Sequence, residues 1–545
     1  MKKHILIIGI FVFCTTICLS QTPLSKKKKL SQEELKTWVH KDYKQDTIAG
    51  TSLEKAYKEL LPNKKGKEII VAVLDTKLDI FHEDLKDQIW VNTDEIPNNG
   101  IDDDNNGYID DVNGWDFLSN NKEEFVAYEN VEIVRVVRKY DSLFKDKKLE
   151  DVSKNQKLAF QIYTKAKNKL ESSLDRYKVR LNNAYTDYET FVKATKLIEK
   201  VLKKEKFTVL DLYNLQKTEQ KDTLVIQYVS FMKKKLRSST TLESIKEDIE
   251  YYENGLYKMY NIDYDERKVV GDDVKNINDR FYGSHKVYGR VPFEHSIPVS
   301  GILGARRDNG IGIQGISNNI KIMPVVMVAS GDEHDKDVAV AIRYAVDNGA
   351  SVINMSWGKN FSTEETWVHD AIKYAEAHDV LLVTSAGNSR RNIDEQKYYL
   401  NDYLNEKEIA NNFMVIGANN YNATEKLAAS FSNYGKEHVD LFAPGVKIYT
   451  TDTNNKYKFT RGTSFASPIV SGIAALIRSH YPNLTASEVK MILMESGTSF
   501  DLNVRIFDEN RKKMYVPFSE LSKSGKVVNA YNALVLAAKV SKKKK

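Results

Sequence analysis

The stretch of this sequence that contains neither glycine nor proline constrains its fold more than any other feature. Of the 26 Gly and 10 Pro among 545 residues, none lies between Trp115 and Asn254. Glycine and proline mark turns, and an even spread would place roughly nine of them in an interval of this length. The interval is therefore built differently from the sequence on either side, and it favours long helices.

Apolar residues within this interval recur at alternating steps of four and three from Leu170 to Leu202. This 3.5-residue period predicts one long helix with lysines and glutamates on its other faces. Helical patterns at 209–236 and 242–252 predict segments that fold back on it as a hairpin. Two roles stay open for this all-helical insertion at 118–270: a stabilising strut, or a gate or docking arm with a protein partner.

The amino terminus is typical of a signal peptide. Two lysines precede an apolar run at 5–19, and small residues stand before a cut after Ser20. The alternative is a membrane anchor, but about 15 apolar residues fall short of the ~20 that span a bilayer. We therefore expect residues 1–20 to be removed and the protein to be exported (secreted, periplasmic or on the cell surface), with no membrane span. Cleavage would remove both cysteines, so the exported protein must be stable without disulfides.

Near-continuous apolar runs recur through the rest of the chain, as is typical of parallel strands buried on both faces. They cover residues 68–75, 320–328, 351–357, 380–385, 413–418 and 439–442. Helical patterns lie at 335–348, 365–378 and 464–480, and a capping box opens one more helix at Thr485. The alternation predicts an α/β fold: a doubly wound, mostly parallel sheet flanked by helices, with its active site at the carboxyl ends of the strands.

The chain ends and the overall charge are less informative. Residues 21–66 are polar and are expected to form a loosely packed N-terminal extension, and 541–545 form a basic tail. The net charge of +6 is small beside 81 basic and 75 acidic residues, so it does not indicate a nucleic-acid partner. With 41% hydrophobic residues, the chain has enough apolar material for a large core.

The segment 462–468 (GTSFASP) opens the last buried helical pattern with Ser464. A serine at a helix N-terminus after a tight glycine turn is exposed to substrate. The helix dipole and the serine N–H also face any negative charge that forms nearby. An ordinary serine N-cap is the alternative, but so many fixed positions in one short segment favour a nucleophile.

This segment and three others resemble the motifs of the subtilisin-like serine protease family, the subtilases. They occur in the family's order: VLDT at 73–76, EHSIPVSGI at 294–302, AGN at 386–388 and GTSFASP at 462–468. The resemblance covers about 66–117 and 270–540, and it implies a subtilisin-like peptidase domain over 67–540 that the insertion interrupts. It further implies a catalytic triad of Asp75, His295 and Ser464, with Asn388 as the oxyanion-hole amide.

Peptide hydrolysis requires these same residue types. A serine hydroxyl needs a base to take its proton, and a histidine that titrates near neutral pH can take it and return it to the leaving amine. A carboxylate fixes the histidine tautomer, and preorganised donors stabilise the oxyanion. We therefore expect an exported serine endopeptidase that cleaves polypeptides through an acyl-enzyme on Ser464, with no cofactor needed for the chemistry.

Two positions depart from the family pattern. Lys77 stands where the family has glycine, so its charge either lowers the pKa of Asp75 or points to solvent. Ser296 and Ile297 replace the glycine and threonine after the triad histidine, and Ser296 would shift the start of that helix. One alternative is therefore a catalytically degenerate subtilase that binds a partner through its insertion. Another is a hydrolase of the same mechanism that acts on esters or on one dedicated precursor.

By the same resemblance, substrate would bind as an extended strand along Ser356, Trp357 and Gly358, with Ala386 and Gly387 on the other wall. Main-chain hydrogen bonds to such an edge accept almost any sequence, and pockets select side chains. Trp357 either narrows a pocket or is an ordinary buried tryptophan, and both interpretations stay open.

An acidic loop at 99–111 precedes the insertion and matches a calcium-binding pattern. Alternate positions carry oxygen ligands, with Gly107 at the sharp turn. The candidate ligands are Asp102, Asp104, Asn106, the Tyr108 carbonyl and Asp110. Asn113 occupies the place of the usual bidentate glutamate, which predicts weak binding. A turn-rich loop without metal is the alternative to a Ca²⁺ site.

Overall fold

A nine-stranded, mostly parallel sheet forms the centre of the protein. The structure is a computed structural model, and it describes residues 29–219, 221–508 and 511–544. The strand order is β12-β15-β9-β8-β5-β4-β1-β3-β2. The strands are β1 (Ile69–Asp75), β2 (Trp115–Asp116), β3 (Ile320–Val326), β4 (Val352–Met355), β5 (Leu381–Ser385), β8 (Phe413–Asn419), β9 (Leu441–Pro444), β12 (Thr498–Ser499) and β15 (Lys526–Val527). The six predicted strands are confirmed within a few residues.

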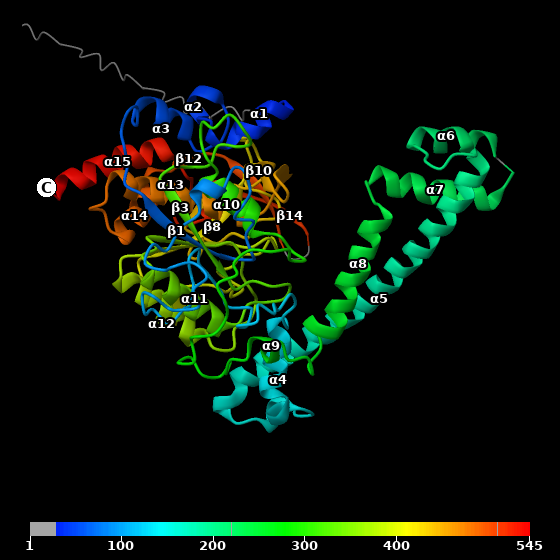
Figure 1. Cartoon of the computed structure of the whole chain (residues 1–545), viewed down its shortest axis with the longest axis horizontal. Coiled ribbons are helices and arrows are strands. Elements are labelled where there is room, and N and C mark those ends of the chain that lie inside the picture. The colour runs from blue at the N-terminus through cyan, green and yellow to red at the C-terminus, as the bar shows by residue number, and fades with distance from the viewer. Residues whose placement is uncertain (1–28, 220, 509–510, 545) are drawn as a thin grey trace, which may run out of the picture.

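Helices cover both faces of this sheet. On one face α13 (Ser467–His480) crosses the central strands beside α10 (Ser296–Gly304), with α14 (Ala486–Ser496) and α15 (Ala530–Lys543) next to it. On the other face lie α11 (Asp335–Asp347) and α12 (Glu365–Ala377) (Figure 1). The doubly wound α/β fold is thus confirmed, and three small hairpins complete it: β6 (Tyr403–Leu404) with β7 (Lys407–Glu408), β10 (Ile448–Asp452) with β11 (Lys456–Thr460), and β13 (Asn503–Phe507) with β14 (Lys513–Pro517).

The predicted signal peptide lies outside the described residues. Among the residues described, no helix combines the length and apolar character that a membrane crossing requires.

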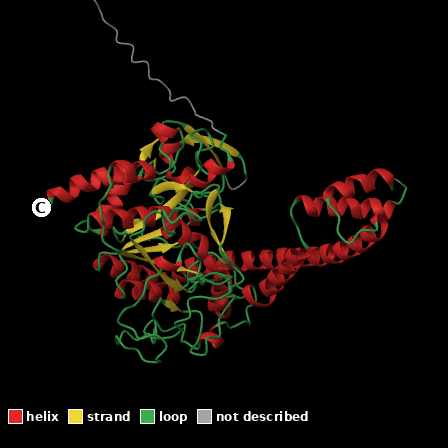
Figure 2. Cartoon of the chain, turned by 45° about the horizontal axis from the view of Figure 1, so that its top comes forward, coloured by secondary structure: helices red, strands yellow, loops and turns green. Residues whose placement is uncertain are grey.

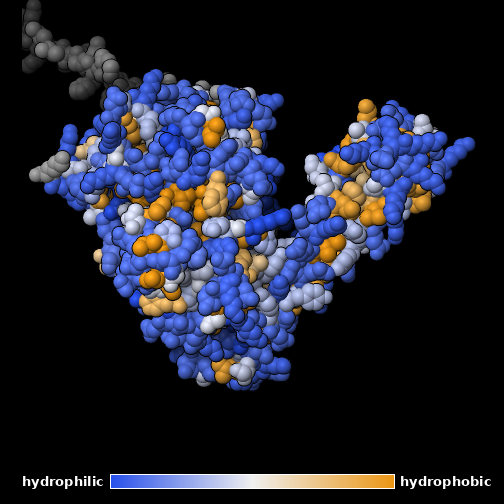
Figure 3. Space-filling view, in the orientation of Figure 1, coloured by the Kyte–Doolittle hydropathy of each residue, from blue (hydrophilic) through white to orange (hydrophobic). Residues whose placement is uncertain are grey.

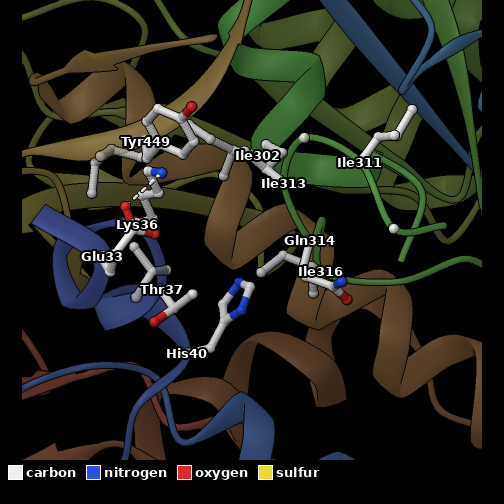
Figure 4. A pocket seen from close by; sticks show the side chains of 14 residues that line it. Glu33, Lys36, Thr37, His40, Ile302, Ile311, Ile313, Gln314, Ile316 and Tyr449 are labelled. Carbon is white, nitrogen blue, oxygen red and sulfur yellow. Dashed lines mark hydrogen bonds and ion pairs between the residues drawn. The ribbon is translucent and has the colours of Figure 1, made fainter. Parts of the chain in front are cut away.

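The expectation that the N-terminal extension packs loosely is wrong. Its helices α1 (Gln32–Thr37), α2 (Tyr43–Asp46) and α3 (Leu53–Glu59) lie on the body, and Trp38 is fully buried. The Trp38 indole N–H donates to the Lys447 carbonyl at 3.1 Å. The composition of this segment does not reveal its buried side chains, because they are spread among lysines. A cavity of about 400 Å³ lies between this extension and the loop at 310–316 (Figure 4).

The insertion forms a helical arm that projects from the body (Figures 1 and 2). It consists of α4 (Glu132–Phe144), α5 (Lys157–Leu202), α6 (Val209–Thr218), α7 (Thr223–Arg237) and α8 (Leu242–Asn254). The helix α8 returns along α5, so the predicted hairpin is confirmed. Gly255 allows the close approach, because a Cβ there would lie 2.3 Å from the Tyr177 ring. The helical pattern at 209–236 forms two helices, because Asp222 accepts two backbone N–H groups and starts a new helix, α7.

Buried ion pairs fasten the base of the arm to the body. Glu132 on α4 pairs with Lys359 of the body at 3.3 Å, and Arg135 on the same helix donates to the backbone carbonyl of Glu333 at 3.1 Å. Arg267, where the chain returns from the arm, bonds Asp337 on α11 at 2.8 Å. Breaking such a buried pair leaves an uncompensated charge and typically costs about 3–5 kcal/mol. The base of the arm is therefore a fixed joint.

Glu333, beside this joint, is expected to weaken the fold at high pH. Burial and then Asp332 raise the pKa of Glu333 from 4.5 to about 8. An acid whose pKa is higher in the folded state stabilises the fold fully at pH values below its unfolded-state pKa. This stabilisation is lost as the pH rises through the folded-state pKa. Glu333→Gln stays neutral, so its Tm should fall less than that of the wild type between about pH 5 and pH 9. Thermal unfolding measures this, with the exposed Glu59→Gln as control, and identical pH profiles would contradict it.

Candidate active site

Asp75 and His295 meet at the carboxyl end of the sheet. Asp75 is the last residue of β1 and is fully buried, and His295 immediately precedes α10. Both carboxylate oxygens of Asp75 lie 2.9 Å from His295 Nδ1. The Thr76 backbone N–H also donates to the Asp75 carboxylate, at 2.8 Å. The carboxylate is thus oriented to hold the imidazole with Nε2 directed away from it.

Thr76 fixes the start of α10. Its hydroxyl oxygen accepts the backbone N–H of His295 at 3.2 Å and that of Ser296 at 3.0 Å. Ser296, where the family has glycine, is fully buried at the first position of the helix. The serine therefore fits while His295 keeps its contact with Asp75.

Lys77, the other departure from the family pattern, neither points to solvent nor pairs with Asp75. Its side chain is buried, and its Nζ lies 3.1 Å from a carboxylate oxygen of Asp116 on β2. The same Nζ stands 4.4 Å from the centre of the Phe125 ring. Both of our expectations for Lys77 are therefore wrong, because the lysine forms a buried ion pair with Asp116 beside the site.

Ser464 lies on a 3₁₀ turn, Thr463–Phe465, just before α13 rather than within that helix. Gly462 precedes the turn with φ 150°, a backbone conformation that favours glycine. The His295 ring packs between Phe293, at 5.2 Å, and Phe465, at 5.6 Å between ring centres. The structure therefore brings His295 beside the turn that carries Ser464.

Asn388 is held by the same turn. Its Oδ1 accepts the Thr463 backbone N–H at 2.9 Å and the Thr463 hydroxyl at 3.1 Å. The Thr463 hydroxyl oxygen also accepts the Gly387 N–H at 3.1 Å. With Oδ1 occupied, Nδ2 faces the turn, where it would lie 3.7 Å from a Cβ built on Gly462. The amide is thus preorganised as a donor next to Ser464.

The two expected substrate walls follow β4 and β5. Ser356 is buried, and its hydroxyl bonds Asn354 at 2.8 Å and Ser467 at 3.0 Å. The Trp357 indole N–H donates to the Leu74 carbonyl at 2.8 Å and only 8% of the side chain is exposed, which favours the interpretation as a core tryptophan. On the other wall, the buried Ala386 accepts a hydrogen bond from Asn433 at 2.8 Å.

Tyr398, which the sequence did not single out, stands between these walls. A Cβ built on Gly358 would lie 2.7 Å from its ring, and one built on Gly387 would lie 2.8 Å from its ring and its hydroxyl. The side chain therefore fills the space that the two glycines leave open. No motif marks it, because the contact joins segments that are adjacent only in the fold.

The acidic loop gathers carboxylates that differ in part from the predicted set. Glu95, Asp104 and Asp111 each place an oxygen within 4.8 Å of the others. Asn106 donates to both Asp104 and Asp111. The other predicted carboxylates serve the loop backbone: Asp102 accepts the N–H groups of 106 and 107, and Asp110 those of 99 and 100. The Tyr108 ring packs in an aromatic cluster with Trp115, Phe117, Phe281 and Tyr344.

The sequence of this chain is similar to those of known proteases. The model of the subtilase family matches residues 66–510. Subtilisin DY from Bacillus licheniformis is 33% identical over 229 residues, which are 42% of this chain and 78% of that protein. The thermophilic serine proteinase of Bacillus sp. (strain AK1) is 38% identical over 192 residues, 35% of this chain and 43% of that protein. A solved protease from Pseudoalteromonas arctica is 25% identical with a TM-score of 0.37, covering 45% of this chain and 70% of that one. The chain thus spans most of subtilisin DY but less than half of the AK1 proteinase.

Proposed function

The chain belongs to the subtilase family, and from this premise we propose that it is an exported serine endopeptidase acting on polypeptides. The similarity to named proteases supports the assignment of this chain as a serine protease. The observation that carries the finer proposal is the pair of 2.9 Å contacts between the Asp75 carboxylate and His295 Nδ1, next to the Ser464 turn. Export rests on the signal-like residues 1–20.

In this mechanism His295 Nε2 takes the proton of the Ser464 hydroxyl as the oxygen attacks the scissile carbonyl. Asp75 keeps the Nδ1–H tautomer and stabilises the imidazolium that forms. His295 then gives the proton to the leaving amine, which leaves an acyl-enzyme on Ser464. A water, deprotonated by the same histidine, hydrolyses this ester and restores the free serine.

The negative oxygen of each tetrahedral intermediate needs donors already in place. The Asn388 Nδ2 group and the Ser464 backbone N–H are the two candidates, since Thr463 holds the Asn388 side chain by its other end. Fixed donors in a site shielded from water stabilise the transition state without reorganisation.

Labelling with a fluorophosphonate tests the proposal most directly. Purified protein without residues 1–20 should be labelled, and Ser464→Ala should not. The labelled protein should also cleave a mixed peptide library. Absence of Ser464-dependent labelling would leave the degenerate binding protein as the better interpretation. Labelling without library cleavage would favour an esterase or an enzyme with one dedicated precursor.

Tyr398→Ala is expected to change the preference for the residue that donates the scissile carbonyl. Because Tyr398 fills the space between Gly358 and Gly387, the wild type should favour small residues there. Emptying the space should raise kcat/KM for a Phe substrate relative to the matching Ala substrate by about tenfold or more. Paired peptides measure the ratio, with Tyr449→Ala as control, because Tyr449 lines the cavity beside the N-terminal extension and not the space between Gly358 and Gly387. An unchanged ratio would refute the assignment.

We also propose that the acidic loop binds Ca²⁺ through Glu95, Asp104 and Asp111. Three carboxylates without nitrogen or sulfur donors fit a hard cation. Burial raises the pKa of Asp111 to about 6, and a nearby cation would favour its charged form. Calcium would serve stability here, with no part in the bond cleavage.

Calcium is therefore expected to raise the Tm by a few degrees at saturating concentration, because a ligand that binds only the folded state stabilises it. Thermal unfolding in Ca²⁺ and in chelator measures the shift. Asp111→Asn should reduce the shift, whereas the exposed Asp87→Asn should keep it. Equal Tm values with and without calcium would contradict the site.

A further inference from the structure

A pocket of about 690 Å³ lies between the base of the arm and the body. One side is the face of α5 that carries Lys165, Lys169 and Arg176, and the other side includes Asn360, Ser389 and Arg391. Figure 3 shows the notch that separates the arm from the body.

This pocket continues the substrate walls. Ser389 directly follows Asn388, and Asn360 comes two residues after Gly358, so both walls run into the pocket. A polypeptide held along the walls would therefore reach the face of α5. This face lies at the base of the arm, whereas the tip of the arm stands away from the body (Figure 1).

Positive charge gathers in the pocket from both sides. Lys165, Lys169 and Arg176 share one face of α5, because their spacings of four and seven residues return to the same side of a helix. Opposite them, Arg391 reaches the Asn360 side chain at 2.8 Å. Desolvation and then Arg176 and Arg391 lower the pKa of Lys169, and Arg391 faces the cations of α5 across the pocket.

The acidic groups nearby already have partners. The Asp332 carboxylate accepts the Glu132 backbone N–H at 2.8 Å. The Glu365 carboxylate pairs with Lys397 at 2.5 Å, which leaves Lys165, Lys169, Arg176 and Arg391 as the cations that give the pocket its charge.

We propose that this pocket binds acidic side chains of the polypeptide substrate, so that the base of the arm is a substrate-recognition element rather than a strut alone. The proposal rests on the proposed protease function, and it names the substrate class: polypeptides with aspartate or glutamate at a fixed position a few residues from the scissile bond. Guanidinium and ammonium groups recognise carboxylates through charge-assisted hydrogen bonds. Because the joint of the arm is pinned by buried ion pairs, the pocket is preformed.

Binding to an inactive variant tests the pocket separately from catalysis. In a Ser464→Ala background, fluorescein-labelled hexaglutamate should bind at least about tenfold more tightly than labelled hexaglutamine, as measured by fluorescence anisotropy at fixed salt. Adding Lys169→Glu and Arg176→Glu should abolish this difference. Adding Lys178→Glu and Lys196→Glu, an equal charge change at exposed positions of α5 outside the pocket, should preserve it.

Equal binding of the two peptides, or equal losses in both double variants, would overturn the proposal. So would a hexathymidylate that binds as tightly as hexaglutamate, because the site would then be a general polyanion patch. Charge-dependent peptide binding combined with absent fluorophosphonate labelling of the intact serine would reject the protease and keep the pocket. Labelling without charge-dependent binding would do the reverse.

Discussion

Asp75→Asn is expected to lower kcat by about 10⁴-fold at neutral pH while the fold stays intact. The effect follows from the two 2.9 Å contacts that Asp75 makes with His295 Nδ1. An asparagine would offer an NH₂ group to that nitrogen and favour the tautomer with the proton on Nε2. His295 could then not accept the proton of Ser464, and no carboxylate would stabilise the imidazolium.

Steady-state cleavage of a peptide that the wild type accepts measures this loss, and thermal unfolding verifies the fold. Asp87→Asn is the matched control, since Asp87 pairs with Arg306 on the surface at 2.7 Å and lies outside the triad. A folded Asp75→Asn variant with less than about a tenfold loss would remove Asp75 from the proposed triad.

The parts of this molecule that sequence could predict are those that local pattern determines. Each buried parallel strand is one apolar run, so β1 and β5 are visible before any tertiary contact is known. The long helix α5 likewise follows from a repeat within its own residues. The Ser464 turn is marked by a motif whose glycine, serine and proline have separate structural roles.

What could not be predicted depends on contacts between distant segments. Lys77 pairs with Asp116 only because β2 lies at the edge of the sheet beyond β3, and nothing in either segment indicates the other. Tyr398 enters the site because two glycines from different strands leave room for it. Trp38 is buried by a partner surface 409 positions away in the chain.

The arm also combines features that local pattern predicts with features that depend on contacts between distant segments. Its helices follow from composition and periodicity, whereas the question of strut or recognition element depends on which face of α5 meets the body. That face is set by Arg135 and Arg267, which bond Glu333 and Asp337, shortly after the pocket residue Asp332 in the chain. The sequence contains both arginines but does not indicate their partners.

Asn388→Ala is expected to lower kcat by about 10²–10³-fold with little change in KM, a loss of about 2.7–4 kcal/mol of transition-state stabilisation. KM should change little because the hydrogen bond from the Asn388 amide to the substrate oxygen reaches its full strength only when that oxygen carries negative charge. The rate of fluorophosphonate labelling should fall as well, since its transition state also places charge there.

Thr463 provides the graded test of this assignment. It holds the Asn388 Oδ1 through its backbone N–H at 2.9 Å and through its hydroxyl at 3.1 Å. Of these two bonds Thr463→Val removes only the second, together with the acceptor of the Gly387 N–H, so its loss in kcat should be smaller than that of Asn388→Ala. Thr463→Ser keeps both donors and should stay near the wild type. Orientation of the amide requires only the two donors. Thr463 would therefore act through packing if Thr463→Val lost as much kcat as Asn388→Ala, or if Thr463→Ser lost as much kcat as Thr463→Val.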